Sequence, residues 1–202
     1  AATATPSSGS FATTQLAVGQ RIVAAPGEKY EWVGTYSEVV LFPAALGGAD
    51  RTTLEGEQGL YYGIQLGPDS ASTPVLDQTS APVVAAYGLR RLRAAYSGPA
   101  IQVRRSSDNA TADIGFTASG QLDLPALIAF VGNGDGYVSV HYDQSGNGRH
   151  AVQTEPGRQP RIMRNGYIAA VGQRPGVDTL FDRGVLSVAG TGFAGQQFNG
   201  TV

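Results

Sequence analysis

Residues 137–149 read YVSVHYDQSGNGR, a strand pattern that runs directly into a polar, glycine-rich turn. Apolar and polar side chains alternate through residues 137–142, as in a strand with one buried face. The glycines after Asp143 permit a tight turn with positive φ. In the structural interpretation, the Asp143 carboxylate accepts backbone N–H groups of this loop. In the functional one, Asp143 is an acid, a metal ligand or a sugar-binding group beside His141 and His150. The residue types favour the structural interpretation.

Composition indicates a globular chain made mainly of short strands and loops. Hydrophobic residues make up 42% of the 202 residues and charged residues only 15%, which is compatible with a packed core. The 28 glycines and 11 prolines favour turns over helices. Because the chain has no cysteine and only two histidines, we expect no disulfide, no thiol nucleophile and no metal site. We expect no other cofactor.

Charge and hydropathy argue against two classes of partner. The net charge is -2, so the chain is not a general binder of nucleic acid, although arginines gather at Arg90, Arg91, Arg93, Arg104 and Arg105. With Asp108 close by, these arginines are expected to pair with carboxylates and loop carbonyls as a structural framework. No apolar run approaches the ~20 residues that cross a bilayer, so we expect no membrane insertion.

The remaining patterns predict a β-rich chain with a few short helices, most simply a sandwich. Residues 67–82 contain three prolines and are typical of a semi-extended, unpacked linker. The turn-rich residues 132–136 predict a hairpin. Further strands are predicted at residues 32–42, 100–103, 114–116, 161–162, 166–171 and 185–188. Helices are predicted over residues 46–62, 84–96 and 124–130.

Several of these segments resemble one known family. Residues 89–105 (LRRLRAAYSGPAIQVRR), 106–108 (SSD), 113–116 (DIGF) and 142–149 (YDQSGNGR) follow one another in the order and spacing that open an arabinofuranosidase B-type module. This is the concanavalin A-like catalytic domain of family 54 α-L-arabinofuranosidases, a module that also occurs in tail and fibre proteins of bacteriophages. The resemblance covers about residues 83–165 and implies an antiparallel concanavalin A-like β-sandwich.

Residues 32–64 resemble the opposite end of the same module, its closing strand and terminal helix. The resemblance therefore divides the chain into a C-terminal part of a module (1–66), a Pro/Ser-rich linker (67–82) and an N-terminal part (83–202). Three arrangements account for this order: a segment spanning two tandem modules, a circular permutation, or a sandwich completed by another copy of the chain.

The departures from the family concern its catalytic groups. The family nucleophile is a Glu on a middle strand, for which no segment here is a match. The family's catalytic Asp falls near Pro26-Gly27-Glu28, where no Asp stands, and its vicinal cysteines are absent. Since retaining hydrolysis needs both carboxylates, the departures predict a non-catalytic module with no catalytic residue.

The resemblance then implies a structural or receptor-binding module of a phage-like tail fibre or spike that recognises host surface carbohydrate. Such a module would be a homo-oligomer, possibly a trimer, that contacts other virion proteins at the particle surface. One alternative is an α-L-arabinofuranosidase or related retaining glycan hydrolase, which requires the missing middle strands to carry a Glu and Glu28 to replace the usual Asp. Another is a purely structural virion component.

Candidate site residues fall into three groups. Sugar-binding platforms are aromatic, and the candidates, each of which is also open to a role in the core, are Tyr30, Trp32, Tyr36, Tyr137 and Tyr142. Glu28, Glu31 and Glu38 flank Trp32 and would suit glycoside chemistry only if two carboxylates lay ~5–9.5 Å apart across a sugar. The predicted structural loop residues are Asp143, Asn147, Asp108, Arg104 and Arg105.

Overall fold

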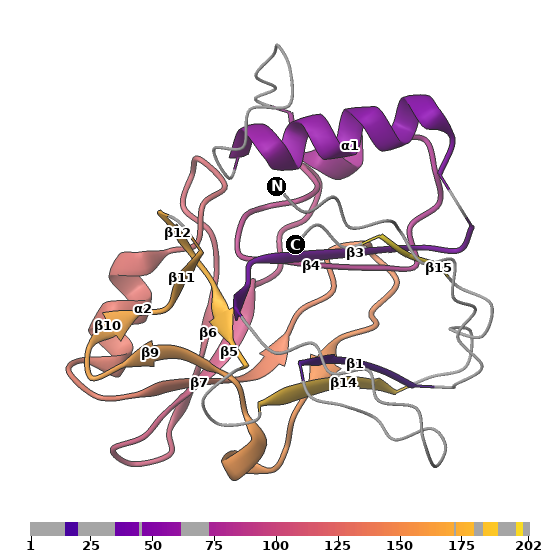
Figure 1. Cartoon of the computed structure of the whole chain (residues 1–202). Coiled ribbons are helices and arrows are strands. Elements are labelled where there is room, and N and C mark those ends of the chain that lie inside the picture. The colour runs from indigo at the N-terminus through magenta and orange to yellow at the C-terminus, as the bar shows by residue number, and fades with distance from the viewer. Residues whose placement is uncertain are drawn as a thin grey trace, which may run out of the picture.

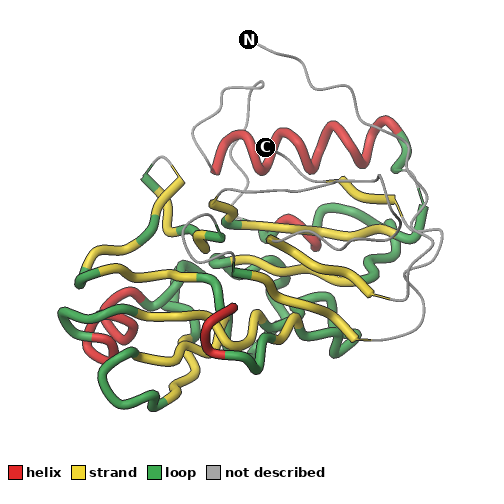
Figure 2. Tube along the Cα trace, turned by 60° about the horizontal axis from the view of Figure 1, so that its bottom comes forward, coloured by secondary structure: helices red, strands yellow, loops and turns green. Residues whose placement is uncertain are grey.

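Three layers build the molecule: a long curled antiparallel sheet, a three-stranded sheet that faces it, and helix α1 (Gly48–Tyr61) on the outer side of the smaller sheet (Figure 1). The computed structural model describes residues 15–19, 35–44, 46–61, 73–171, 173–179, 184–189 and 197–199. Every strand pairing among these residues is antiparallel. The predicted mainly β sandwich with a few helices is therefore confirmed. Figure 2 shows the strand layers below α1 after a turn about the horizontal axis.

The large sheet carries most of the strands. Along its main path lie β1 (Gln15–Gly19), β14 (Val185–Ala189), β8 (Ala151–Val152), β7 (Gly136–His141), β9 (Arg161–Arg164), β13 (Val177–Asp178) and β2 (Thr35–Tyr36). Off this path are β5 (Ile101–Arg105), β6 (Thr111–Ile114) and β10 (Tyr167–Ile168). The small sheet contains β15 (Gln197–Asn199), β3 (Glu38–Phe42) and β4 (Ala85–Gly88), and a separate hairpin contains β11 (Ala170–Val171) and β12 (Arg174–Pro175).

Strand β3 is buried on both faces because it lies between two hydrophobic cores. Val39 and Leu41 point into the core between the sheets, whereas Val40 and Phe42 belong to a second core shared with Leu54 of α1. A strand covered on both faces is expected to be a nearly continuous apolar run. This explains why residues 38–42 read EVVLF without alternation.

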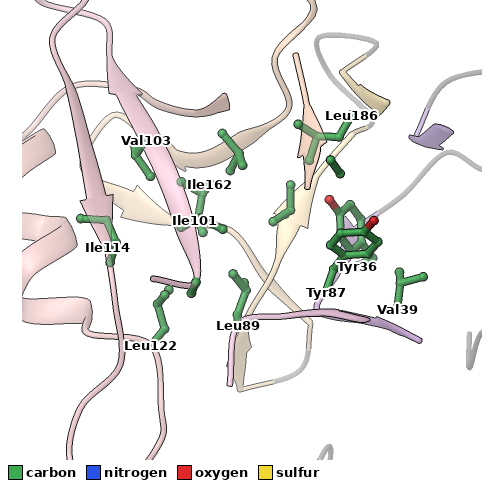
Figure 3. Close-up of a cluster of buried hydrophobic side chains, with 14 of the residues drawn as sticks. Tyr36, Val39, Tyr87, Leu89, Ile101, Val103, Ile114, Leu122, Ile162 and Leu186 are labelled. Carbon is green, nitrogen blue, oxygen red and sulfur yellow. The ribbon is translucent and has the colours of Figure 1, made fainter. Parts of the chain in front are cut away.

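The main core fills the space between the two sheets (Figure 3). Strand β7 contributes both Val138 and His141 to buried positions, although a regular strand would turn residues three apart to opposite faces. Its pairing with β5 shifts register here, so that Val138 and Val140 oppose consecutive residues and Ser139 is the extra residue of a bulge. The bulge places the His141 ring inside the core.

The predicted helix over residues 124–130 is confirmed as α2 (Leu124–Val131). Asp123 caps it by accepting a hydrogen bond from Ala126 N at 3.0 Å. Gly132, with φ of 66°, ends it. The predicted hairpin at residues 132–136 is wrong, since this segment joins α2 to β7.

The predicted helix over residues 84–96 is also wrong. Strand β4 begins that segment, and a turn follows the strand. The apolar residues whose spacing suggests a helix are buried in the strand and in the turn. Leu89 enters the main core and Leu92 enters the core under α1. Pairing with β3 supplies β4 with backbone hydrogen bonds, so tertiary contacts override the local pattern.

The expected unpacked linker is wrong for its described part, residues 73–82. A short 3-10 helix, η1 (Val75–Asp77), buries Val75 and Leu76, and Leu76 N donates to the Leu92 carbonyl at 2.8 Å. A second 3-10 helix, η2 (Pro156–Arg158), follows β8. Because β3 pairs with β4 across this segment, residues on both sides of it share one core; the division into module ends stays a prediction. Among the described helices, none is both long and apolar enough to span a membrane.

Candidate functional site

The Asp143 carboxylate binds its own loop to strand β4. Its Oδ1 accepts hydrogen bonds from Ala86 N at 2.8 Å and from Ser145 N at 2.9 Å. Its Oδ2 accepts from Ser145 Oγ at 2.8 Å and from Arg149 N at 3.0 Å. The side chain is buried, and both oxygens are fully engaged. This geometry leaves Asp143 no oxygen free to act on a sugar.

Two neighbours in the same loop extend this attachment. Gln144 is completely buried; its Oε1 accepts from Leu92 N at 2.8 Å, and its Nε2 donates to the carbonyls of Gly88 and Arg90. Asn147 Nδ2 donates to the carbonyl of Val83 at 2.7 Å and to that of Val84 at 3.0 Å. Three polar side chains of one loop thus satisfy backbone groups within β4 and on either side of it.

The two histidines of the segment have different surroundings. His141 is buried between Tyr36 and Tyr87, with ring centroids 5.9 and 5.6 Å away, and Tyr36 Oη lies 3.4 Å from its Nδ1. Burial lowers the pKa of His141 to about 4, against a small opposing effect of the Gly88 backbone. His150 is exposed, and its Nδ1 accepts from Asp143 N at 3.1 Å. His141 is therefore a neutral core residue at neutral pH.

A buried ion pair lies between the small sheet and α1. Arg90 Nε is 2.8 Å from Glu38 Oε2, and Arg90 Nη1 is 3.9 Å from Glu57 Oε2; their side chains are 9%, 2% and 5% exposed, respectively. The Arg90 guanidinium also stacks over the Tyr61 ring at 4.2 Å, and that of Arg174 lies 4.4 Å from the same ring. Glu38 and Glu57 thus both contact the Arg90 guanidinium, which engages these carboxylates in a buried charge cluster.

The predicted aromatic platforms are dispersed. Tyr30 and Trp32, like Glu28 and Glu31, lie outside the described residues. Tyr36 is 6% exposed and packs in the main core, which leaves its ring no face for a ligand (Figure 3). Tyr137 and Tyr142 are half-buried on β7 and immediately after it.

The rings of Tyr137 and Tyr142 have different neighbours. Tyr137 has two guanidinium groups over its ring, from Arg104 at 4.7 Å and Arg161 at 5.3 Å. Tyr142 donates to Asp113 Oδ1 at 2.8 Å, and burial, helped by this carboxylate, raises its pKa to about 12. The three candidates that the structure describes, Tyr36, Tyr137 and Tyr142, therefore have separate surroundings and do not form one sugar platform.

The predicted arginine framework is present at the β5–β6 hairpin. Arg105 binds Asp108 through two hydrogen bonds of 2.8 and 2.7 Å and lowers the pKa of that carboxyl to about 2. Arg104 donates to Gln159, to Asn109 and to the Pro156 carbonyl. These contacts join loops to the β5–β6 hairpin. The assignment of Arg104, Arg105 and Asp108 as structural rather than sugar-binding residues stays a prediction.

The described surface includes a hollow along α1 and another at the β9–β10 hairpin. The first has a volume of about 520 Å³ and includes Thr52, Thr53, Glu57 and Gln78. The threonine hydroxyls there already donate to the carbonyls of Gly48 and Ala49. The other, of about 300 Å³, lies at the β9–β10 hairpin beside Tyr167. No group of three or more potential metal-binding side chains occurs within the described ranges.

Sequence reasoning missed three of these features. The burial of Gln144 and the Glu38–Arg90 pair depend on partners 52 to 56 positions away, so no local pattern reveals them. Tyr167 follows an Asn-Gly dipeptide, and that dipeptide is a hairpin signal that could have located it.

Comparison with known proteins gives a consistent result. The profile of the family described as "Alpha-L-arabinofuranosidase B, catalytic" matches residues 74–192. The probable α-L-arabinofuranosidase B of Aspergillus fumigatus is 37% identical over 125 residues, which are 59% of this chain and 25% of that protein. The α-L-arabinofuranosidase of Hypocrea jecorina and the arabinofuranosidase/B-xylosidase of Trichoderma koningii are each 36% identical over 124 residues, with the same shares. A solved arabinofuranosidase complexed with arabinofuranosyl-α-1,2-xylobiose is 38% identical over 42% of this chain and 18% of its own, with a TM-score of 0.33.

These matches correct the functional expectation. This chain spans about a quarter of the length of these curated relatives. They are named as arabinofuranosidases, and the matching profile is that of the catalytic domain. The prediction of a non-catalytic phage fibre or virion module is therefore wrong, and the alternative that the sequence left open is the better supported one. The expected oligomer, host glycan and particle-surface location stay predictions.

Proposed function

The chain belongs to the family of α-L-arabinofuranosidase B catalytic domains, and on that premise we propose that the protein removes α-L-arabinofuranosyl groups from carbohydrate by retaining hydrolysis. The observation that carries the proposal is the catalytic-domain match over residues 74–192, more than half of the chain. It includes the loop of Asp143, Gln144 and Asn147 that joins the two sheets.

The matched segment supplies the scaffold of the proposed enzyme. Retaining hydrolysis uses one carboxylate as nucleophile and a second as acid and then base, ~5–5.5 Å apart. Asp143 is not suited to either role because backbone and hydroxyl donors occupy both of its oxygens. Glu38 and Glu57 are not suited either, since both are buried against Arg90. We therefore assign these three carboxylates to the fold.

Glu28 is the candidate for the acid of this proposal, as the residue that takes the place of the family's Asp. The nucleophile stays unassigned, because no segment here matches the family strand that carries the nucleophilic Glu. The test is release of 4-nitrophenol from 4-nitrophenyl α-L-arabinofuranoside by the purified protein. We expect release by the wild type and its loss in Glu28→Gln. Glu31→Gln, the same change three residues away, is the matched control and should keep the activity.

A second substrate makes the test more specific. One relative is named as both an arabinofuranosidase and a xylosidase, so 4-nitrophenyl β-D-xyloside should be assayed in parallel. Preferential release from the arabinofuranoside supports the proposal. No release from the arabinofuranoside, or release from the xyloside alone, contradicts it.

A further inference from the structure

The β9–β10 hairpin holds an exposed tyrosine on a well-bound turn at one end of the large sheet (Figure 1). The turn residues Asn165 and Gly166 have positive φ angles of 49° and 80°, as a type I′ turn requires. Asn165 N donates to Asp135 Oδ1 at 2.8 Å, and Gly166 N donates to the Gly134 carbonyl at 3.0 Å. Tyr167 follows directly and is 80% exposed. The ring therefore faces solvent from a fixed backbone.

The hollow beside this ring has both apolar and polar walls. Its volume is about 300 Å³, at the small end of the ~300–1,000 Å³ range of ligand sites. The residues that matter here are Tyr167, Met163, Ile168, Arg161, Arg164 and Asp178. Ile168, the next residue along β10, packs against the main core, so the hairpin is anchored on one face and presents Tyr167 on the other.

The charged groups around the hollow are of both signs and partly fixed in place. Arg161 Nη1 lies 3.8 Å from Asp135 Oδ2, its Nη2 donates to Tyr137 Oη at 3.3 Å, and its guanidinium stacks on that ring. Asp178, together with Asp135 that pairs with Arg161, offsets the positive charges of Arg161 and Arg164. Such a site has neither the basic excess that selects anions nor the acidic cluster that selects cations, and its groups suit hydroxyls.

We propose that this hollow binds a neutral pentose oligosaccharide, with the C–H face of one sugar ring on Tyr167 and its hydroxyls on Asp178 and the two arginines. An exposed aromatic ring joined to a few convergent polar groups is the usual construction of such sites. This inference rests on the proposed function: the oligosaccharide is the chain whose arabinosyl groups the enzyme removes. Holding that chain at a second point raises its effective concentration at the catalytic groups.

The test compares binding of two soluble polysaccharides by affinity electrophoresis, arabinoxylan for a xylose backbone and arabinan for an arabinose backbone. Retardation of the wild type by either one identifies the backbone. Tyr167→Ala should weaken the binding about tenfold, as truncation of a central aromatic contact does. Tyr167→Phe keeps the ring face and should bind like the wild type. Val171→Ala, on neighbouring β11, is the matched change at an exposed apolar residue and should have no effect.

Wild-type protein that neither polysaccharide retards, or Tyr167→Ala that binds as well as the wild type, would overturn the inference. Because Tyr167 is exposed, its substitution should not change the melting temperature of the protein. Loss of binding then shows that Tyr167 contacts the polysaccharide. Hydrolysis of the single-sugar chromogenic substrate separates the two proposals. If that hydrolysis occurs without polysaccharide binding, only this inference fails; if binding occurs without hydrolysis, the proposed function fails and binding at Tyr167 stands.

Discussion

Asp143 shows how one side chain can join distant parts of a chain. Its carboxylate accepts hydrogen bonds from residues 57 positions before it and 6 positions after it. A carboxylate is suited to this because it accepts through both oxygens and donates through none. The nitrogen of Ala86 and that of Arg149 would lose their partner together if it were removed.

Replacement of Asp143 by Ala should therefore lower the free energy of unfolding by roughly 1–3 kcal/mol, because buried N–H groups lose their acceptor. Urea unfolding followed by circular dichroism measures this. The matched control is Asp108→Asn, at an exposed ion pair with Arg105, which should leave stability nearly unchanged. Equal effects of the two substitutions would contradict the structural role of Asp143.

His141 should make stability fall in mild acid. Its folded pKa is about 4, below the usual 6.5, so the unfolded chain takes up a proton first as the pH falls. Stability is then fully present above pH 6.5 and decreases as the pH falls toward 4, by roughly 1.4 kcal/mol for each unit of pKa difference.

The variant His141→Phe keeps an aromatic ring between Tyr36 and Tyr87 and removes the titration. Its unfolding free energy should depend less on pH than that of the wild type between pH 7 and pH 4. Identical slopes for the two proteins would show that His141 does not titrate in this way.

At the scale of elements, Arg90 holds α1 on the small sheet. The guanidinium contacts Glu38 of β3, Glu57 of α1 and the ring of Tyr61 at the end of that helix. Arg90→Met should cost about 3–5 kcal/mol, because it leaves buried carboxylates without this cation. The double variant Arg90→Met/Glu38→Leu should recover part of that loss. If the Arg90→Met variant were as stable in urea as the wild type, that result would contradict this role.

The elements that the sequence predicts correctly are those set by local patterns. Alternation at residues 137–142 predicts β7, and the apolar residues after Asp123 predict α2. The prediction of a helix over residues 84–96 is wrong because Leu89 and Leu92 have helical spacing but are buried in two different cores. The sequence does not predict the contacts of the candidate site for a related reason. The partners of Gln144 and Arg90 are distant in the sequence and are brought close by the tertiary fold. Composition could not separate core tyrosines such as Tyr36 from exposed ones.

At the scale of the whole molecule, the described residues of the ranges 35–61 and 74–192, the second of which is matched by the family profile, form one structure. Strand β3 pairs with β4, Tyr36 of β2 packs against His141 of β7, and α1 covers the small sheet (Figures 1 and 2). The segment that the family profile matches thus shares its cores with a segment that precedes it. The inverted module order stays a prediction, and the family assignment relies on the matched residues 74–192.

The measurement that tests the central claim most directly is the stereochemistry of sugar transfer. The purified protein would be incubated with 4-nitrophenyl α-L-arabinofuranoside in buffer that contains methanol, and the methyl glycoside would be identified by proton NMR. A retaining arabinofuranosidase transfers the sugar through a covalent intermediate, so the account predicts methyl α-L-arabinofuranoside as the product. Formation of the β anomer, or no transfer and no hydrolysis at all, would contradict it.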